Sequence, residues 1–130
     1  MSALEEGAAL GPWTIESVSN EAMKDVALVL DDPNPIHLSG EAAAAAGLGD
    51  RPVNQGPVNM GYVLDMLRSA APGAVVKDLR VRLLANVFAG DRVIAAGEVL
   101  ATEGNRVTCA VWLDVEGAGR AIEGTATLEL

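Results

Sequence analysis

The stretch PVNMGYVLDMLRSAA, residues 57–71, is the part of this 130-residue chain that says most about its fold. Pro57 suits the first turn of a helix, where its missing N–H would have no partner, and Pro72-Gly73 ends the pattern. The apolar side chains cover most of the circumference of this predicted helix: Val58, Met60, Tyr62, Val63, Met66 and Leu67. A helix that is apolar nearly all round is predicted to be wrapped by other structure instead of lying on a surface.

The residues that follow this helix have the pattern of strands. From Asp78 to Val87, apolar and polar residues alternate with the two-residue period of a β-strand. Three more strands are predicted, separated by short turns rich in glycine: Arg92 to Thr102, Arg106 to Val115 and Ala121 to Leu130. Consecutive strands joined by tight turns require an antiparallel sheet.

Three predicted elements precede the long helix. They are a strand from Trp13 to Val18, a helix from Glu21 to about Leu30, and a short helix over Ala42 to Ala46 that Ser39 caps and Gly47 ends. With the helices on one face of the sheet, the fold class is α+β. The length is that of one ordinary domain, residues 1–130.

The composition excludes several classes of function. A formal net charge of −9 and a pI of about 4.4 disfavour binding to nucleic acid or to anionic membrane surfaces. No run approaches the ~20 apolar residues of a membrane span, and the first residues, 1–11, do not have the pattern of a targeting segment, so a cytoplasmic protein is expected. Cys109 is the only cysteine and lies in an alternating apolar run, which favours a buried thiol over a nucleophile.

The most informative motif is Asp32-Pro33-Asn34-Pro35-Ile36-His37, because it places an acid and the only histidine five residues apart. The two prolines disfavour a continuing helix, so this segment is predicted to be an ordered loop. His37 has the side chain whose ordinary pKa lies closest to neutrality, and the Asn34 amide can donate and accept hydrogen bonds. The alternative is a structural turn, since Asp-Pro and Asn-Pro commonly initiate turns.

The motif resembles the signature of the MaoC-like, R-specific enoyl-CoA hydratases, a family with the hot-dog fold, in which an antiparallel sheet wraps around a long central helix. The residues 82–91 and 123–126 resemble later strands of the same family. The resemblance implies that Asp32 and His37 are the catalytic acid/base pair around one water and that Asn34 helps to fix their geometry. Which of the two is the base stays open, because the pair titrates as one system.

The resemblance also implies that the backbone N–H of Gly56 stabilises the enolate oxygen, at the positive end of the long helix. The family usually has His-Gly-Met here, whereas this chain has Gln55-Gly56-Pro57. The alternative role of Gly56 is that of a turn glycine. A second departure is Leu30-Asp31, where the family prefers Ser-Gly; Asp31 is a like-charge neighbour that can raise a carboxyl pKa or simply face the solvent.

Substrate binding is predicted for residues on both sides of the expected site. An anionic thioester substrate needs local cations in so acidic a chain, whether its carrier is CoA or an acyl carrier protein. The candidates are Arg51, Arg68, Arg80 and Arg82, each with a solvated surface position as its alternative. Gln55 and Pro57 flank the expected oxyanion donor. The candidates for the acyl pocket are Val58, Tyr62, Val63 and Met66, with core packing as the alternative for most of them. No metal and no cofactor besides the thioester substrate is predicted.

Two other functions remain open at this stage. One is a non-catalytic subunit that supports the active site of a partner, as in heteromeric members of the family that act on bulky CoA esters; the altered neighbours of Gly56 favour it. The other is a hot-dog acyl-CoA thioesterase, which does not use the Asp32 to His37 motif. Exposed sheet edges and few aromatic residues predict at least a dimer, with an identical or a different hot-dog subunit.

Overall fold

The structure is a computed structural model that describes residues 4–32 and 34–130. Its strands are β1 (Ala9–Ile15), β2 (Val75–Leu83), β3 (Val93–Glu103), β4 (Arg106–Val115) and β5 (Gly119–Glu129). Its helices are α1 (Asn20–Leu30), the 3₁₀ helix η1 (Pro35–His37), α2 (Gly40–Ala45) and α3 (Gly56–Ala70). The predicted order of elements is confirmed.

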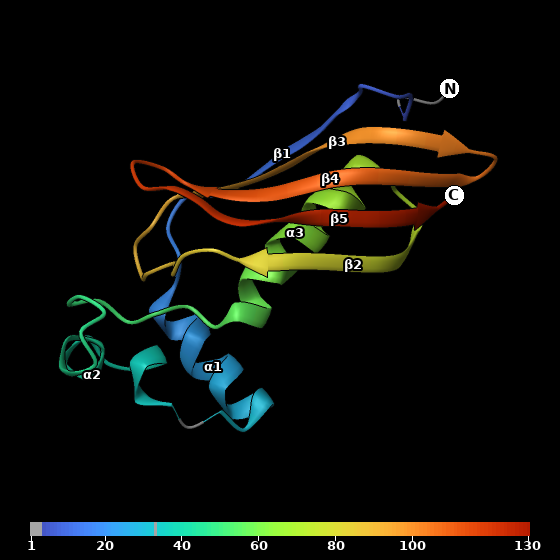
Figure 1. Cartoon of the computed structure of the whole chain (residues 1–130). Helices are drawn as coiled ribbons and strands as arrows, with labels where there is room; N and C mark the ends of the chain where they lie inside the picture. The colour runs from blue at the N-terminus through green and yellow to red at the C-terminus, as the bar shows by residue number, and fades with distance from the viewer. Residues whose placement is uncertain (1–3, 33) are drawn as a thin grey trace.

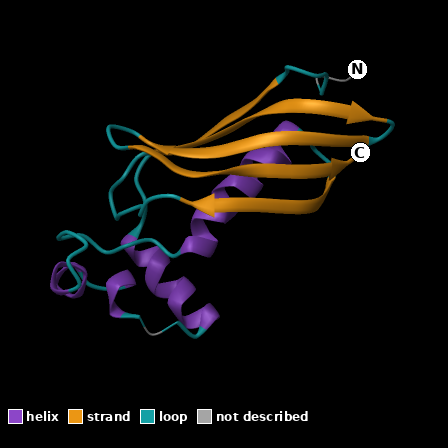
Figure 2. Cartoon of the chain, in the orientation of Figure 1, coloured by secondary structure: helices purple, strands orange, loops and turns teal. Residues whose placement is uncertain are grey.

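The five strands form one antiparallel sheet in the order β1-β3-β4-β5-β2, and α3 packs along one face of it (Figure 1). Figure 2 shows all the helices on the same side of the sheet, with α1 and α2 grouped beyond one end of the strands. This is the α+β, hot-dog arrangement of a sheet around a central helix that the sequence predicted.

The core between α3 and the sheet consists mainly of aliphatic side chains. Val63, Met66 and Leu67 of α3 are almost completely buried, as the apolar pattern of this helix predicted. Gly97 of β3 has no room for a side chain, because a Cβ atom there would lie 2.5 Å from the carbonyl oxygen of Ala110 in β4 and 3.4 Å from Met66 Cε of α3. Cys109 is fully buried in the same core.

Several strand boundaries differ from the prediction, most of all in the first strand and in the strand after α3. The first strand begins at Ala9 instead of Trp13, and its register with β3 shifts between Leu10 and Trp13, around Gly11-Pro12. The strand after α3 covers Val75–Leu83 and ends before Val87. The alternation continues past Leu83, but Val87 lies outside the strands: its side chain is buried in the core, and its carbonyl oxygen accepts a hydrogen bond of 2.7 Å from the N–H of Asn54.

The edges of the sheet are β1 and β2, each of which pairs with one strand within the described chain. Among the helices of residues 4–32 and 34–130, none is long and apolar enough to cross a bilayer.

Candidate active site

The end of α1 turns the chain so that Asp32 faces back toward the protein. Asp31 caps the helix in the left-handed region, with φ 50° and ψ 45°, and its N–H points at the carbonyl oxygens of Ala27 and Leu28. The N–H of Asp32 then donates to the carbonyl oxygen of Ala27 over 3.0 Å. The backbone of Asp32 is thereby fixed at the C-terminal end of α1.

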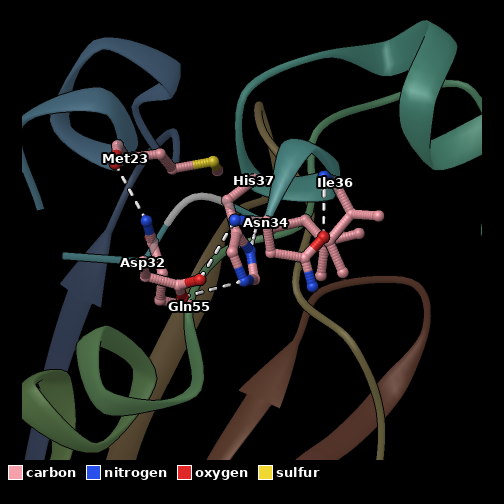
Figure 3. A network of polar contacts seen from close by, with 7 residues as sticks. Met23, Asp32, Asn34, Ile36, His37 and Gln55 are labelled. Carbon is pink, nitrogen blue, oxygen red and sulfur yellow. Dashed lines mark hydrogen bonds and ion pairs between the residues drawn. The ribbon is translucent and has the colours of Figure 1, made fainter. Parts of the chain in front are cut away.

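The polar groups of the following loop hold its turn together. The Asn34 N–H donates to Asp32 Oδ1 over 3.2 Å, and Asn34 Oδ1 accepts from the N–H of Ile36 over 3.3 Å, which caps η1 (Figure 3). Pro33 lies outside the described residues. Asn34 therefore connects the acid to the helical turn that carries the histidine.

His37 lies between this loop and the segment before α3. Its Nδ1 lies 2.6 Å from the carbonyl oxygen of Val53, and its Nε2 lies 3.5 Å from Asp32 Oδ2 (Figure 3). A carbonyl oxygen only accepts, so Nδ1 carries a hydrogen, and Nε2 is the nitrogen that faces Asp32. The N–H of Val53 donates in turn to the carbonyl oxygen of Ile36.

The pair is partly shielded from solvent and is not locked together. The side chains of His37 and Asp32 are 12% and 35% exposed. At 3.5 Å, their separation is an ion-pair distance and is long for a direct hydrogen bond. The two groups can thus share a small hydrogen-bonding molecule, as an acid and a base acting on one water must do.

The segment 53–56 brings the start of α3 to this site. Val53 forms an isolated bridge with Phe88, and Gly56 is the first residue of α3, so its N–H has no partner within the helix. Pro57 has no N–H, so Gly56 is the donor at this helix start. A Cβ atom on Gly56 would lie 3.2 Å from Leu83 Cδ1, which places the end of β2 against the same point.

Gln55 is buried beside Gly56 and connects two helices. Its Nε2 donates to the carbonyl oxygen of Met23 in α1 over 2.8 Å (Figure 3). Its Oε1 is buried and has no hydrogen-bond partner in the part of the chain that the structure describes. The side chain does not cap α3.

A buried polar cluster follows along α3. Asn54 Nδ2 donates to Asn59 Oδ1 over 2.8 Å and to the Tyr62 hydroxyl over 3.2 Å. Burial raises the pKa of Tyr62, and the hydrogen bond from Asn54 opposes this effect. The sequence pattern suggested an acyl pocket for Tyr62 and did not predict this cluster, although two asparagines in an apolar stretch were its signal.

A surface pocket of about 430 Å³ opens beside the acid. It is lined by Lys24, Ala27, Leu28, Asp31, Asp32 and Leu38. Its walls therefore come from the C-terminal part of α1 and from the loop that follows.

The predicted arginines lie at two places. Arg51 donates to the carbonyl oxygen of Ala89 over 2.9 Å, pairs with Asp91 over 2.8 Å and lies over the ring of Phe88, so it also supports the loop before β3. Arg80 and Arg82 line a groove of about 510 Å³ along β2, β4 and β5, together with Trp112 and Arg120 of the neighbouring strands.

Only some of the predicted site residues are brought together by described contacts. Asp32, Asn34 and His37 form one bonded unit, and Val53 links it to the segment that contains Gln55 and Gly56. Arg80 and Arg82 line the separate groove along β2, β4 and β5 instead. Val58 and Tyr62 are half-buried, whereas Pro57 is exposed. In the described residues, no three His, Cys, Asp or Glu side chains gather as a metal site would require.

The whole architecture is similar to solved hydratase structures. The (R)-hydratase from A. caviae involved in PHA biosynthesis superposes with a TM-score of 0.90 at 24% identity, over 100% of this chain and 99% of that one. The R-hydratase PhaJ1 from Pseudomonas aeruginosa gives 0.86 at 23% identity, over 97% and 81% of the two chains. A chain of the ChsH1-ChsH2 complex from Mycobacterium tuberculosis gives 0.85 at 24% identity, over 96% and 97%. These likenesses define the class as a hot-dog protein.

The sequence itself identifies the family. Residues 13–116 match the MaoC like domain, and the chain belongs to this family of hydratases and dehydratases. No curated protein matches the chain in sequence. The family predicted from the Asp32 to His37 motif is confirmed.

Proposed function

We propose that this protein hydrates trans-2-enoyl thioesters of CoA, or of an acyl carrier protein, to (R)-3-hydroxyacyl thioesters, or catalyses the reverse dehydration. The observation that carries the proposal is the Asp32 and His37 pair, with Nε2 facing Asp32 Oδ2 at 3.5 Å and Nδ1 held by the Val53 carbonyl. This geometry suits proton transfer to and from one water.

The reaction needs two proton transfers and one site for negative charge. The water oxygen bonds to C3 while one member of the pair takes a proton from it. The electrons of the C2=C3 bond move to the thioester, forming an enolate, and C2 then receives a proton from the other member. Asp32 and His37 share these two steps as a coupled acid and base.

We assign to the N–H of Gly56 the hydrogen bond that stabilises the enolate oxygen. As the first residue of a 15-residue helix, Gly56 offers a donor at the positive end of the macrodipole, where developing negative charge is stabilised. Pro57 supplies no second donor from the next position. The stabilisation of the enolate therefore depends on this one N–H more than on any neighbouring amide.

We assign substrate binding to the groups around this centre. Val58, Pro57 and Tyr62 of α3 are proposed to contact the acyl chain. Arg51, Arg80 and Arg82 are proposed to attract the anionic part of CoA. A local cation is required because the chain carries a net charge of −9, and its long-range repulsion is screened only beyond about 8 Å at physiological salt.

A second candidate function is that of a supporting subunit in a heteromeric hydratase for bulky acyl-CoA esters. The observation that favours it is the likeness to a chain of the ChsH1-ChsH2 complex, together with Gln55 and Pro57 on either side of Gly56. Hydratase activity of the purified chain alone would exclude this function. An acyl-CoA thioesterase is distinguished by release of free CoA without loss of the enoyl absorbance.

The proposal is tested with Asp32→Asn and His37→Gln in a spectrophotometric screen of enoyl-CoA esters of increasing bulk. Each variant is expected to lose roughly 10²-fold or more in kcat, the usual size of a general acid/base contribution. The matched control is Asp25→Asn, which removes an exposed carboxylate of α1 and leaves kcat unchanged. Near-normal turnover in both pair variants contradicts the assignment. The chirality of the product is determined in the same reactions.

A further inference from the structure

Gln55 carries the strongest unexplained feature of the site, a buried acceptor without a donor. The residue is 1% exposed, and its Oε1 has no partner among the described residues. Buried polar atoms are nearly always hydrogen-bonded, because leaving one unpaired costs about 1–3 kcal/mol. A partner from outside the chain is therefore indicated.

The orientation of the Gln55 amide is fixed by chemistry. The group that faces the Met23 carbonyl oxygen at 2.8 Å must be the NH₂, since a carbonyl oxygen cannot donate. Oε1 is then the other branch of the amide, directed away from that contact. Figure 3 shows the side chain reaching from the start of α3 to Met23, in the same region where Asp32 and His37 face each other.

The neighbours of Gln55 tie it to the reaction centre. Val53, two residues earlier, holds His37 Nδ1, and Gly56, the next residue, begins α3. The start of α3 thus offers one donor, the Gly56 N–H, and one acceptor, Gln55 Oε1. A thioester oxygen can use only the donor, whereas a water or a hydroxyl group can use the acceptor.

We propose that Gln55 Oε1 accepts a hydrogen bond from the water that adds to C3, and from the 3-hydroxyl group that this water becomes. Of the two water hydrogens, one leaves to the Asp32 and His37 pair, and the other stays on the new hydroxyl and points at Gln55. In the dehydration direction the same contact recognises the 3-hydroxyl group of the substrate. This role rests on the proposed hydratase function.

The test measures the coupling between Gln55 and the ligand hydroxyl. The ligands are a matched pair of CoA thioethers, 3-hydroxyalkyl-CoA and alkyl-CoA, of the chain length that the wild type hydrates best. Neither ligand can react, because they lack the carbonyl that acidifies C2. Their Kd values are determined for the wild type and for Gln55→Met, which keeps the length of the side chain and removes its acceptor.

The wild type is expected to bind the hydroxylated ligand about tenfold more tightly, the effect of one hydrogen bond, and Gln55→Met is expected to lose most of this preference. The matched control is Asn20→Ala, which removes the other buried unpartnered amide oxygen, at the opposite end of α1; it keeps the wild-type ratio. A general loosening of the fold would weaken the binding of both ligands equally and leave the ratio of their Kd values unchanged.

The inference is overturned if the ratio of the two Kd values is unchanged in Gln55→Met, or if the wild type shows no preference for the hydroxylated ligand. If the wild type still hydrates enoyl-CoA in that case, the proposed function stands. If the wild type neither hydrates any enoyl-CoA nor binds the thioethers, the proposed function fails and this inference fails with it. Should Gln55→Met not fold, Gln55→Glu replaces it: its carboxyl retains an acceptor oxygen and is expected to keep the ratio within about threefold of the wild type. Loss of the preference in this variant overturns the inference.

Discussion

His37 is held by two contacts that have different functions. The Val53 carbonyl fixes the hydrogen on Nδ1, and the 3.5 Å separation from Asp32 leaves Nε2 available for proton exchange. Because Val53 offers a backbone atom, this orientation does not depend on the type of side chain at position 53. The segment before α3 therefore fixes the orientation of the His37 ring.

Asp31 is the least favourable residue of this loop. It is the one non-glycine residue with a positive φ in the described chain, and its carboxylate lies at the negative end of the α1 dipole. Asp31→Gly is expected to raise the free energy of unfolding by about 1 kcal/mol, measured by urea denaturation. Asp31→Asn is the control that removes only the charge. A loss of stability in Asp31→Gly would show that the carboxylate has a favourable contact.

Cys109 gives a pH dependence of stability. Burial raises the pKa of its thiol from an ordinary value of 9.0. Below pH 9 both the folded and the unfolded chain keep the proton, so stability is fully present; as the pH rises further, only the unfolded chain ionises and stability is lost. The free energy of unfolding is expected to fall as the pH rises above about 9, with a smaller fall in Cys109→Ala. Equal slopes in both proteins would refute this origin.

Among the elements, α3 is the one that connects the sheet to the site. Its buried face packs on the sheet, and its first turn meets Leu83 at the end of β2 and the segment 53–55. The loop 84–92 returns to that segment through the hydrogen bond from Asn54 to Val87. The site is therefore built on the ends of elements whose positions the core fixes.

The buried polar cluster at the start of α3 is expected to stabilise this junction. Asn54→Ala removes the donor to Asn59 Oδ1 and to the Tyr62 hydroxyl, and is expected to cost about 1–3 kcal/mol because buried partners lose their hydrogen bonds. The measurement is urea denaturation of Asn54→Ala, Tyr62→Phe and the double variant. The losses in the free energy of unfolding of the two single variants should not add in the double variant, since both remove the same hydrogen bond between Asn54 and Tyr62. Full additivity would mean that the contact contributes nothing.

Two glycines of the helix and the sheet provide a matched test of packing. Gly61 lies within α3, and a Cβ atom added there would meet nothing within 4 Å, so Gly61→Ala is expected to stabilise the protein by about 0.5–1 kcal/mol. Gly97→Ala would place its methyl group 2.5 Å from the Ala110 carbonyl oxygen and is expected to destabilise by about 1–3 kcal/mol. Thermal unfolding of both variants checks the pair. The same sign for both changes would contradict the close approach of the β4 backbone to Gly97.

The whole molecule combines a strongly acidic surface with exposed apolar side chains. Leu28 and Val29 of α1 are each 83% exposed, and Leu83 of β2 is 60% exposed. The outer edge of β2 has no strand beside it within the described chain. Such features are typical of surfaces that associate.

We expect the protein to form at least a dimer, with twice the chain mass of 13.4 kDa. Light scattering after size exclusion gives the mass, and the same fractions are assayed for hydration of enoyl-CoA. If the chain is active only after addition of a different hot-dog subunit, the partner is not identical. A stable and active monomer would contradict the expectation.

The helix around residues 57–71 and the four strands after it could be predicted from the sequence, as could the end of α1 before the Asp32 to His37 motif, whereas the 3₁₀ helix Pro35–His37 within the motif was not predicted. These features follow from local rules: apolar periodicity and the restriction of φ by proline. The boundaries failed where distant contacts replaced the local pattern, as at Val87, which alternates like a strand residue but bonds Asn54.

The assembly of the site, in contrast, could be read only from the folded chain. The contacts of His37 with Val53 and of Gln55 with Met23 join residues 16 and 32 positions apart. The position of Arg51 against Asp91 is of the same kind. No periodicity in the sequence encodes such pairs, because they form only when packing of α3 against the sheet brings separate segments to one end of the molecule.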